Sequence, residues 1–263
     1  MKKAIIYVIE FLVIQLIVGW IVGAVWQLIT KSQDTTTAMI ITTTVASSVA
    51  IIAIFLLLRW TEVSPRWLRT RPWSVLTWSV VAAAGALVPS MWLQEQIPEL
   101  PNLLDNEFDM ILSNRWGYLA IGLLAPLSEE IVLRGAVLRS LLNKPLFTNG
   151  STELNTWTAI SISAFFFALI HLNPAQMPHA FLIGLLLGWM YWRTGYILPG
   201  VAYHWANNSM AYILYNIYPD PDMRLVEVLG TQKHVLMAVG FSLLILVPAI
   251  FQLNMWMKRA DEN

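Results

Sequence analysis

Three charged side chains stand in residues 125–135, a stretch with the otherwise apolar sequence APLSEEIVLRG. They are Glu129, Glu130 and Arg134. A charged side chain at the centre of a bilayer costs roughly 2.5 to 3.5 kcal/mol on insertion scales, so such residues are rare there and usually functional. This stretch is therefore the first candidate for a catalytic or binding site.

Helical spacing gives the two carboxylates different roles. Glu130 and Arg134 are four residues apart, share a face and can neutralise each other inside the membrane. Glu129 points about 100° away and has no partner within its own helix. A carboxylate held out of water takes up a proton readily, which suits a general base near neutral pH. The alternative is that both acids only lock helices together.

Two later segments add neutral polar groups. Phe167 and His171 share a helix face, and so do His204 and Asn208. Together with Glu129 they supply a base, a histidine to hold or polarise a water, and two donors for an oxyanion, which are the parts needed to hydrolyse an amide. His179 stands near a span boundary and is predicted to be structural.

Other protease designs are disfavoured by the residues present. The chain has no cysteine, no Gly-x-Ser-Gly nucleophile setting, no His-Glu-x-x-His helix and no pair of intramembrane aspartates. Water activated by a glutamate is the chemistry that remains.

The whole composition indicates a polytopic membrane protein of the all-α class. Of its 263 residues 57% are hydrophobic and 12% charged, and the mean hydropathy is +0.60. Apolar runs of about 20 residues predict about eight transmembrane helices around an intramembrane polar cavity. Their predicted ranges are 4–26, 39–58, 73–94, 116–142, 156–172, 177–193, 196–214 and 234–257.

The placement of charge predicts the orientation. Most basic residues, including a stretch over 59–71, lie on the face shared with both termini, so both termini are expected in the cytoplasm. We expect a multi-pass protein of a bacterial plasma membrane, in contact with membrane lipid. Its formal net charge is zero, which gives no reason to expect a nucleic-acid partner. The chain divides into helices and an acidic external loop over 1–115, a core over 116–214, and a loop and final helix over 215–263.

The ordered set Glu-Glu-x-x-x-Arg at 129–134, Phe-x-x-x-His at 167–171 and His-x-x-x-Asn at 204–208 resembles the CPBP family of intramembrane proteases. This family includes type II CAAX prenyl endopeptidases and the bacterial Abi and bacteriocin-immunity proteins. The resemblance implies that Glu129 is the general base, that His171 helps to position water, and that His204 and Asn208 form the oxyanion pocket. Glu130, Arg134 and Phe167 would support them. The implied substrate is a membrane-associated or lipidated peptide or protein.

Several alternatives stay open. Glu129, His171 and His204 could hold zinc or another divalent metal, but the Asn208 amide is a poor zinc ligand and a good oxyanion donor, so no metal or other cofactor is favoured. A non-enzymatic immunity or scaffold protein is the second functional hypothesis, and a transporter the third. Gly184 and Gly188 form a Gly-x-x-x-Gly that suits packing within one chain or between two, so the oligomeric state is open.

Linear depth raises a difficulty for this site. Counting about 1.5 Å per residue from the predicted cytoplasmic ends puts Glu129 near mid-membrane, His204 in the inner half and His171 toward the outer end of its span. The catalytic hypothesis therefore requires a tilted or displaced helix before His171.

Overall fold

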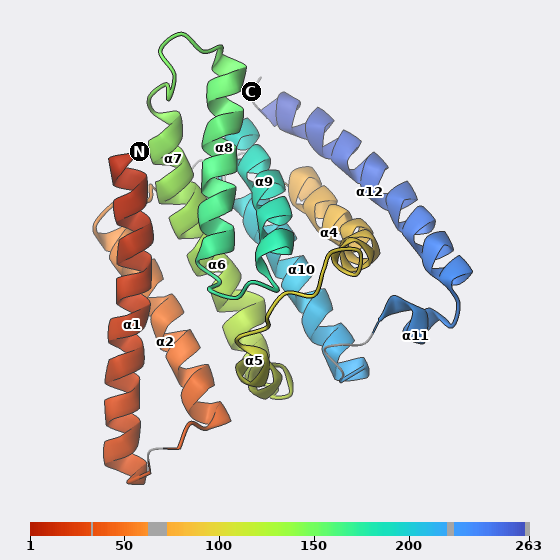
Figure 1. Ribbon diagram of the computed structural model, residues 1–263. Helices are drawn as coiled ribbons and strands as arrows, with labels where there is room; N and C mark the ends of the chain where they lie inside the picture. Colours follow the sequence, from red (N-terminus) through yellow and green to blue (C-terminus); the bar gives the residue numbers. More distant parts are fainter. Residues whose placement is uncertain (33, 63–72, 220–223, 261–263) are drawn as a thin grey trace.

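The structure is a computed structural model that describes residues 1–32, 34–62, 73–219 and 224–260. Every regular element in these ranges is helical (Figure 1). The long helices are α1 (Lys2–Thr30), α2 (Thr37–Leu57), α4 (Trp73–Gln94), α8 (Thr152–Leu169), α9 (Met177–Thr194), α10 (Leu198–Ile217) and α12 (Gln232–Ala260). The shorter ones are α5 (Asp105–Leu112), η1 (Tyr118–Leu124), α6 (Ala125–Glu130), η2 (Ile131–Leu138), α7 (Arg139–Leu142) and α11 (Leu225–Leu229). The all-α class is confirmed.

Within the described ranges, four helices are long and apolar enough to cross a membrane, namely α1, α2, α4 and α12 up to Met257. The other four predicted spans also fall largely on helical residues, but they do not meet this criterion. Residues 118–142 are divided into four short segments, and α8 to α10 are less uniformly apolar. A membrane protein with several spans is thus supported, while the count of eight stays a prediction.

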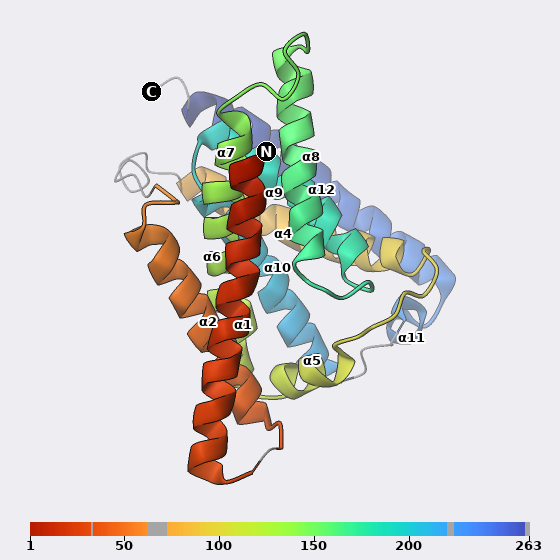
Figure 2. The ribbon, with the colours of Figure 1, turned by 60° about the vertical axis from the view of Figure 1, so that its left-hand side comes forward.

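The helices form three groups around the middle of the molecule. Helix α1 packs on α2 and η2, and α4 packs on α12 and α10. Between these pairs lie α8, α9, α10 and the segments from η1 to α7 (Figures 1 and 2). The start of α1 and the end of α12 lie at the same end of the molecule in both views. The predicted basic loop over 59–71 lies largely outside the described residues.

A continuous helical rod runs through this middle group. The segments η1, α6, η2 and α7 follow one another from Tyr118 to Leu142 with right-handed helical residues at each junction. Both η1 and η2 are π-helical, a wider form that is uncommon and frequently occurs at functional sites. All eight residues of η2 are buried. The rod therefore passes through the core while its winding changes beside Glu129 and Glu130.

Polar side chains from other elements bind backbone carbonyls of η2. The Thr61 hydroxyl donates to the Ile131 carbonyl at 2.7 Å, and the Ser163 hydroxyl donates to the Leu133 carbonyl at 3.0 Å. Both side chains are buried. A carbonyl oxygen has two lone pairs, so it accepts such a bond in addition to a helical one. These bonds fix η2 against α8 and against the residues that follow α2.

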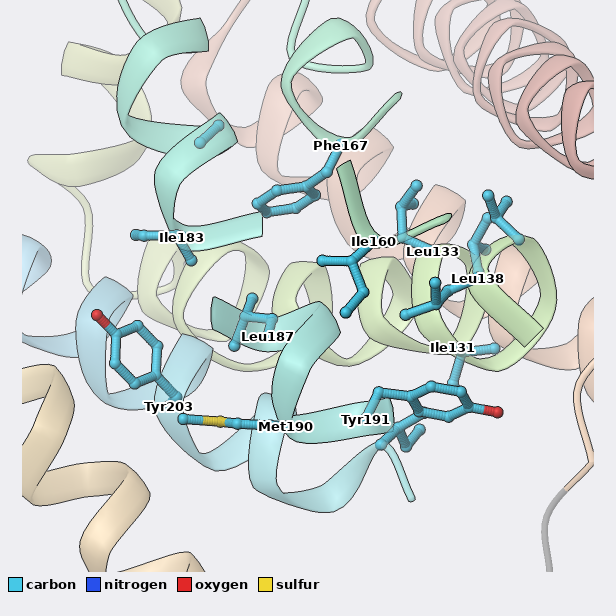
Figure 3. Packing of buried hydrophobic residues seen from close by; sticks show 14 of the residues in the cluster. Ile131, Leu133, Leu138, Ile160, Phe167, Ile183, Leu187, Met190, Tyr191 and Tyr203 are labelled. Atoms are coloured by element: carbon cyan, nitrogen blue, oxygen red, sulfur yellow. The ribbon is translucent and has the colours of Figure 1, made fainter. Parts of the chain in front are cut away.

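The apolar core surrounds the same rod. Side chains of η2, α8, α9 and α10 meet there, and Figure 3 shows Ile131 and Leu133 of η2, Ile160 of α8 and Leu187 of α9 among the residues of this cluster. Each buried aliphatic side chain of this kind contributes about 1.5–3 kcal/mol relative to exposure in water. In a membrane protein this close packing also supplies the dispersion contacts that hold helices together.

The two glycines of the Gly-x-x-x-Gly pattern pack within the chain. A Cβ atom on Gly184 would lie 2.9 Å from the Ala164 Cα, and one on Gly188 would lie 2.9 Å from Ile160 Cγ2. Their lack of a side chain lets α9 approach α8 closely. This face is therefore used inside the monomer, and it gives no support for a dimer contact.

Close packing of α4 on α12 leads to a test of the fold. A Cβ atom on Gly85 would lie 2.6 Å from the backbone nitrogen of Leu246, so Gly85→Ala should push the helices apart and lower the free energy of unfolding by about 1–3 kcal/mol. Gly240→Ala on α12 is the matched control, because nothing lies within 4 Å of its added Cβ. Thermal unfolding in detergent should show a lower Tm for Gly85→Ala only. Equal Tm values would contradict the helix packing described above.

Candidate active site

A fully buried ion pair lies at the centre of the site. Arg134 Nη1 donates to Glu130 Oε1 at 2.8 Å, and neither side chain is exposed. Arg134 Nη2 also donates to the Gly184 carbonyl at 3.2 Å, and the guanidinium lies 4.5 Å from the centre of the Phe167 ring. The i, i+4 spacing predicts this pair. The contacts with Gly184 and Phe167 show that it also joins α8 and α9 to the rod.

Helix α10 closes over Glu130. A Cβ atom on Gly200 would lie 2.7 Å from Glu130 Oε2. Glycine at this position therefore lets the backbone of α10 lie directly against the carboxylate. Oε2 is buried and forms no hydrogen bond within the described residues.

The His204 ring lies between the two carboxylates. Its Nδ1 is 3.3 Å from Glu130 Oε1, and its Nε2 is 3.8 Å from Glu129 Oε2. The first contact is a hydrogen bond in which Nδ1–H donates to the carboxylate. The second is too long for a direct hydrogen bond, and a water beside both atoms is the usual way to connect groups at such a distance. His204 thus links the supported carboxylate to the free one.

Glu129 differs from its neighbour in both exposure and bonding. Its side chain is 18% exposed, whereas that of Glu130 is 0% exposed. Glu129 Oε2 is buried and has no hydrogen-bond partner among the described residues. A buried carboxylate oxygen without a donor is unfavourable unless a water or ligand reaches it. The two acids therefore have the different environments that the sequence predicts.

His171 lies outside the helix in which it was expected. The predicted span runs over 156–172, but α8 ends at Leu169 and His171 lies in the turn that follows. Its Nδ1 donates to the Phe167 carbonyl at 2.7 Å, because that carbonyl lies in the last turn, where backbone partners run out. In the neutral ring this hydrogen bond places the proton on Nδ1 and leaves Nε2 as the acceptor.

The turn that carries His171 is held by the connection between α4 and α5. Leu172 has a left-handed backbone with φ of 51°, and the next residue, Asn173, is fully buried. Asn173 Oδ1 accepts from the Leu103 amide at 3.0 Å, and its Nδ2 donates to Asn102 Oδ1 at 2.8 Å. These tertiary hydrogen bonds hold the turn in which α8 ends and so help to position His171.

The Phe167 ring contacts both histidines. Its centre is 5.1 Å from that of His171 and 5.5 Å from that of His204, with edge-to-face geometry in both cases. The difficulty of linear depth is thereby reduced, because α8 ends before His171 and the turn directs its ring back toward Phe167. Figure 3 shows the Phe167 ring extending from α8 toward α9.

Asn208 lies one turn after His204 on α10 and contacts the rod at a different level. Its Nδ2 donates to the Ile121 carbonyl of η1 at 2.9 Å, and its Oδ1 accepts from Asn207 Nδ2 at 3.3 Å. One of the two Nδ2 hydrogens is therefore used, and the other is oriented by that bond. No described contact joins Asn208 to Glu129 or to the histidines.

The residues proposed for a metal do not converge on one point. Among the described residues, no group of three His, Asp or Glu side chains is placed to hold an ion. Glu129 and His204 approach each other, but His171 meets them only through the Phe167 ring. Both histidines do bond an oxygen through Nδ1, which leaves Nε2 for a ligand, so they individually have the chemistry of zinc ligands.

Several site residues have no clear signal in the sequence. Thr61 looks like an ordinary polar residue of a charged loop and Ser163 like a small polar residue of an apolar segment, and nothing in their spacing points to η2. Asn173 precedes Pro174, a pair that indicates a turn but not its contacts. Gly200 follows a proline near the start of α10. Only the folded arrangement shows that it makes room for Glu130.

The match to known protein families falls on the region that contains this site. Residues 111–210 match the family model of the type II CAAX prenyl endopeptidase Rce1-like proteins. This region is a domain of that family. The resemblance to CPBP proteases, expected over 116–214, is confirmed on a match to somewhat more than a third of the chain. No curated protein and no solved structure matches the chain.

The two glutamates of this Rce1-like domain should respond differently to the same substitution. Glu130→Gln leaves the buried Arg134 guanidinium without a counter-charge, so the free energy of unfolding should fall by about 3 kcal/mol or more. Glu129→Gln removes no hydrogen bond and should change it by less than about 1 kcal/mol. Thermal unfolding in one detergent measures both. A larger loss for Glu129→Gln would mean that the two roles are exchanged.

Proposed function

We propose that this protein is an intramembrane endopeptidase that hydrolyses a peptide bond of a membrane-associated or lipidated substrate. The observation that carries the proposal is Glu129 Oε2, a buried oxygen without a hydrogen-bond donor that faces His204 Nε2 at 3.8 Å. A water bound beside both atoms would occupy the position of a nucleophile. The Rce1-like family of residues 111–210 supports the same class of reaction.

The proposed mechanism assigns one step to each group. Glu129 takes a proton from the water, and the water oxygen attacks the carbonyl carbon of the substrate. His171 Nε2 accepts a hydrogen bond from the second water hydrogen, which stays on the oxygen and becomes the acid O–H of the product, while Nδ1–H donates to the Phe167 carbonyl. Glu129 then transfers its proton to the leaving nitrogen, and the C–N bond breaks.

The oxyanion of the tetrahedral intermediate needs fixed donors. In this proposal His204, which contacts Glu130 through Nδ1 and approaches Glu129 through Nε2, is the first of these donors. Glu130 holds the Nδ1 side, so Nε2–H donates to the oxyanion. Asn208 supplies the Nδ2 hydrogen that Ile121 does not use. Glu130 and Arg134 act only as support, since both are completely buried.

The proposal uses no metal, and metal-dependent hydrolysis is its main variant. The paired contacts of His204 with two carboxylates favour a donor role, and the Asn208 amide suits an oxyanion better than zinc. In the variant, Glu129, His171 and His204 would hold the ion, which would supply a Lewis acid and an activated water. Metal analysis of the purified protein together with activity after chelation decides between the two.

The setting of the substrate is also part of the proposal. The long apolar helices indicate that lipid surrounds the protein. In the predicted orientation both termini lie in the cytoplasm, and we expect that of a bacterial cell. A substrate would then reach the site as a membrane-associated segment, as expected of a CAAX-type endopeptidase. A lipid anchor on that segment would raise its concentration at the membrane.

The test is comparison of membranes that contain the wild-type protein or a variant of the proposed catalytic residues. Glu129→Ala and His171→Ala should each lower cleavage at least about 100-fold, the usual contribution of a general base or a positioned proton acceptor. Peptide termini that appear only with the wild-type protein, identified by mass spectrometry, give the substrate and the cleaved bond. Equal amounts of folded protein must be present in each membrane.

Persistence of the same termini in Glu129→Ala membranes would refute glutamate-dependent hydrolysis. If the biological effect also survives replacement of Glu129, His171, His204 and Asn208, the chain is a non-enzymatic partner such as an immunity or scaffold protein. Glu129→Gln, which keeps the shape of the side chain, is the control for a variant that loses cleavage because less folded protein is present.

A further inference from the structure

The hydroxyl of Tyr118, the first residue of η1, is hydrogen-bonded to two residues of α10. Trp205 Nε1–H donates to the Tyr118 oxygen at 3.0 Å, and the hydroxyls of Tyr118 and Ser209 form a second hydrogen bond of 3.0 Å. Trp205 and Ser209 are four residues apart, so they lie on the same face of α10. One hydroxyl therefore holds the start of η1 against a full turn of α10.

Asn208, the second proposed oxyanion donor, lies within that turn of α10. It directly precedes Ser209, and its Nδ2 donates to the Ile121 carbonyl at 2.9 Å. Ile121 follows Tyr118 by three residues, so the two contacts join neighbouring positions of η1 to neighbouring positions of α10. Because the partner of the amide is a backbone carbonyl of η1, the orientation of Asn208 depends on the place of η1 relative to α10.

The Tyr118 ring is held by its own segment and by α10. A Cβ atom on Gly122 would lie 2.6 Å from two atoms of the ring, so glycine at this position lets the ring lie directly on η1. The Tyr212 ring of α10 lies 5.3 Å from it between centres, tilted by 56°. Ser209 is buried, so water does not readily replace the Tyr118 hydroxyl as its partner. These contacts fix the position of the hydroxyl.

The position of the Asn208 amide matters because an oxyanion donor works only at short range. One Nδ2 hydrogen is bound to the Ile121 carbonyl, and this bond sets the direction of the other. A donor must lie about 2.7–3.1 Å from the position that the oxyanion takes. A small shift of η1 along α10 would therefore move the free hydrogen out of range.

We propose that Tyr118 is a positioning residue of the oxyanion pocket, which fixes η1 on α10 and thereby aims the free Nδ2 hydrogen of Asn208 at the oxyanion. This inference rests on the proposed endopeptidase function and adds a residue to it. The Tyr118 hydroxyl is itself engaged by Trp205 and Ser209, so it acts through Asn208 and does not touch the substrate.

The first test is the kinetics of Tyr118→Phe, which keeps the ring on Gly122 and removes only the hydroxyl. The substrate is a synthetic peptide that spans the bond cut only in wild-type membranes. The kcat should fall about tenfold, which is part of the loss of about 100- to 1,000-fold expected when a whole oxyanion donor is removed. KM should change less than about twofold, because the oxyanion exists only in the transition state.

Tyr212→Phe is the matched control. The Tyr212 hydroxyl donates to the Asn114 carbonyl at 3.1 Å, so this variant also removes one tyrosine hydrogen bond from α10, but one turn beyond Asn208. Its kcat and KM should stay within about twofold of the wild-type values.

Ser209→Ala is the second variant if Tyr118→Phe does not fold. It removes one hydrogen bond of the same hydroxyl from the α10 side. The kcat should fall about threefold, a smaller loss than for Tyr118→Phe because Trp205 still holds the hydroxyl.

A double variant tests whether Tyr118 acts through Asn208. The probe is a peptide aldehyde that carries the residues before the cleaved bond, because its hydrate resembles the tetrahedral intermediate and its binding is measured without turnover. Tyr118→Phe should raise the Kd of this aldehyde about tenfold in the otherwise wild-type protein, but less than about twofold in Asn208→Ala protein. A hydroxyl that only supports the fold would have the same effect in both proteins.

The outcomes separate the positioning role from the function. Absence of peptide termini specific to wild-type membranes overturns the proposed function and the role of Tyr118 with it. If the peptide is cleaved, the role of Tyr118 alone is overturned by an unchanged kcat in folded Tyr118→Phe or Ser209→Ala protein, or by an equal loss in Tyr212→Phe. An equal change of the aldehyde Kd with and without Asn208 also overturns it.

Discussion

The buried ion pair between Arg134 and Glu130 is the interaction on which the rest of the site depends. Two charges held entirely out of water are stable only when their remaining polar atoms are well placed. The pair meets part of this demand with the Gly184 carbonyl, the Phe167 ring and the His204 imidazole, which come from three different helices, while Glu130 Oε2 and Arg134 Nε have no hydrogen-bond partner among the described residues. Satisfying one ion pair therefore fixes α8, α9 and α10 around the rod, and the same contacts place the proposed catalytic groups.

The parts of this site that sequence spacing predicts are the local ones. The i, i+4 relation of Glu130 and Arg134 follows from helix geometry, and it leaves Glu129 on another side whatever the tertiary structure is. The position of His171 could not be predicted in this way. It depends on the turn after α8, and hydrogen bonds of Asn173 to a connection some 70 residues earlier hold that turn in place. The sequence predicts the helical class and the ranges of the apolar helices, because composition and length determine them. The change to π-helical winding has no sequence signal.

The π-helical segments explain how a polar site coexists with tight packing. A wider helix displaces its backbone toward its neighbours, and the carbonyls of Ile121, Ile131 and Leu133 each receive a side-chain donor. These bonds tie the rod on both sides of Glu129 to other elements. A proposed base at that position has little freedom to move, and preorganised groups of this kind are the ones that stabilise a transition state.

The order of these residues along the chain has a consequence for biosynthesis. Glu130 and Arg134 are within one helical turn, so their pair forms as soon as that segment becomes helical. The turn with His171 is synthesised later, after the connection that contains Asn102, to which the turn is hydrogen-bonded. His204 is synthesised later still. During synthesis the N-terminal parts of a chain fold before the C-terminal parts. A partly synthesised chain consequently contains the neutralised acid pair before His204 has been made, and the set of proposed catalytic groups is complete only when the last third of the chain has entered the membrane.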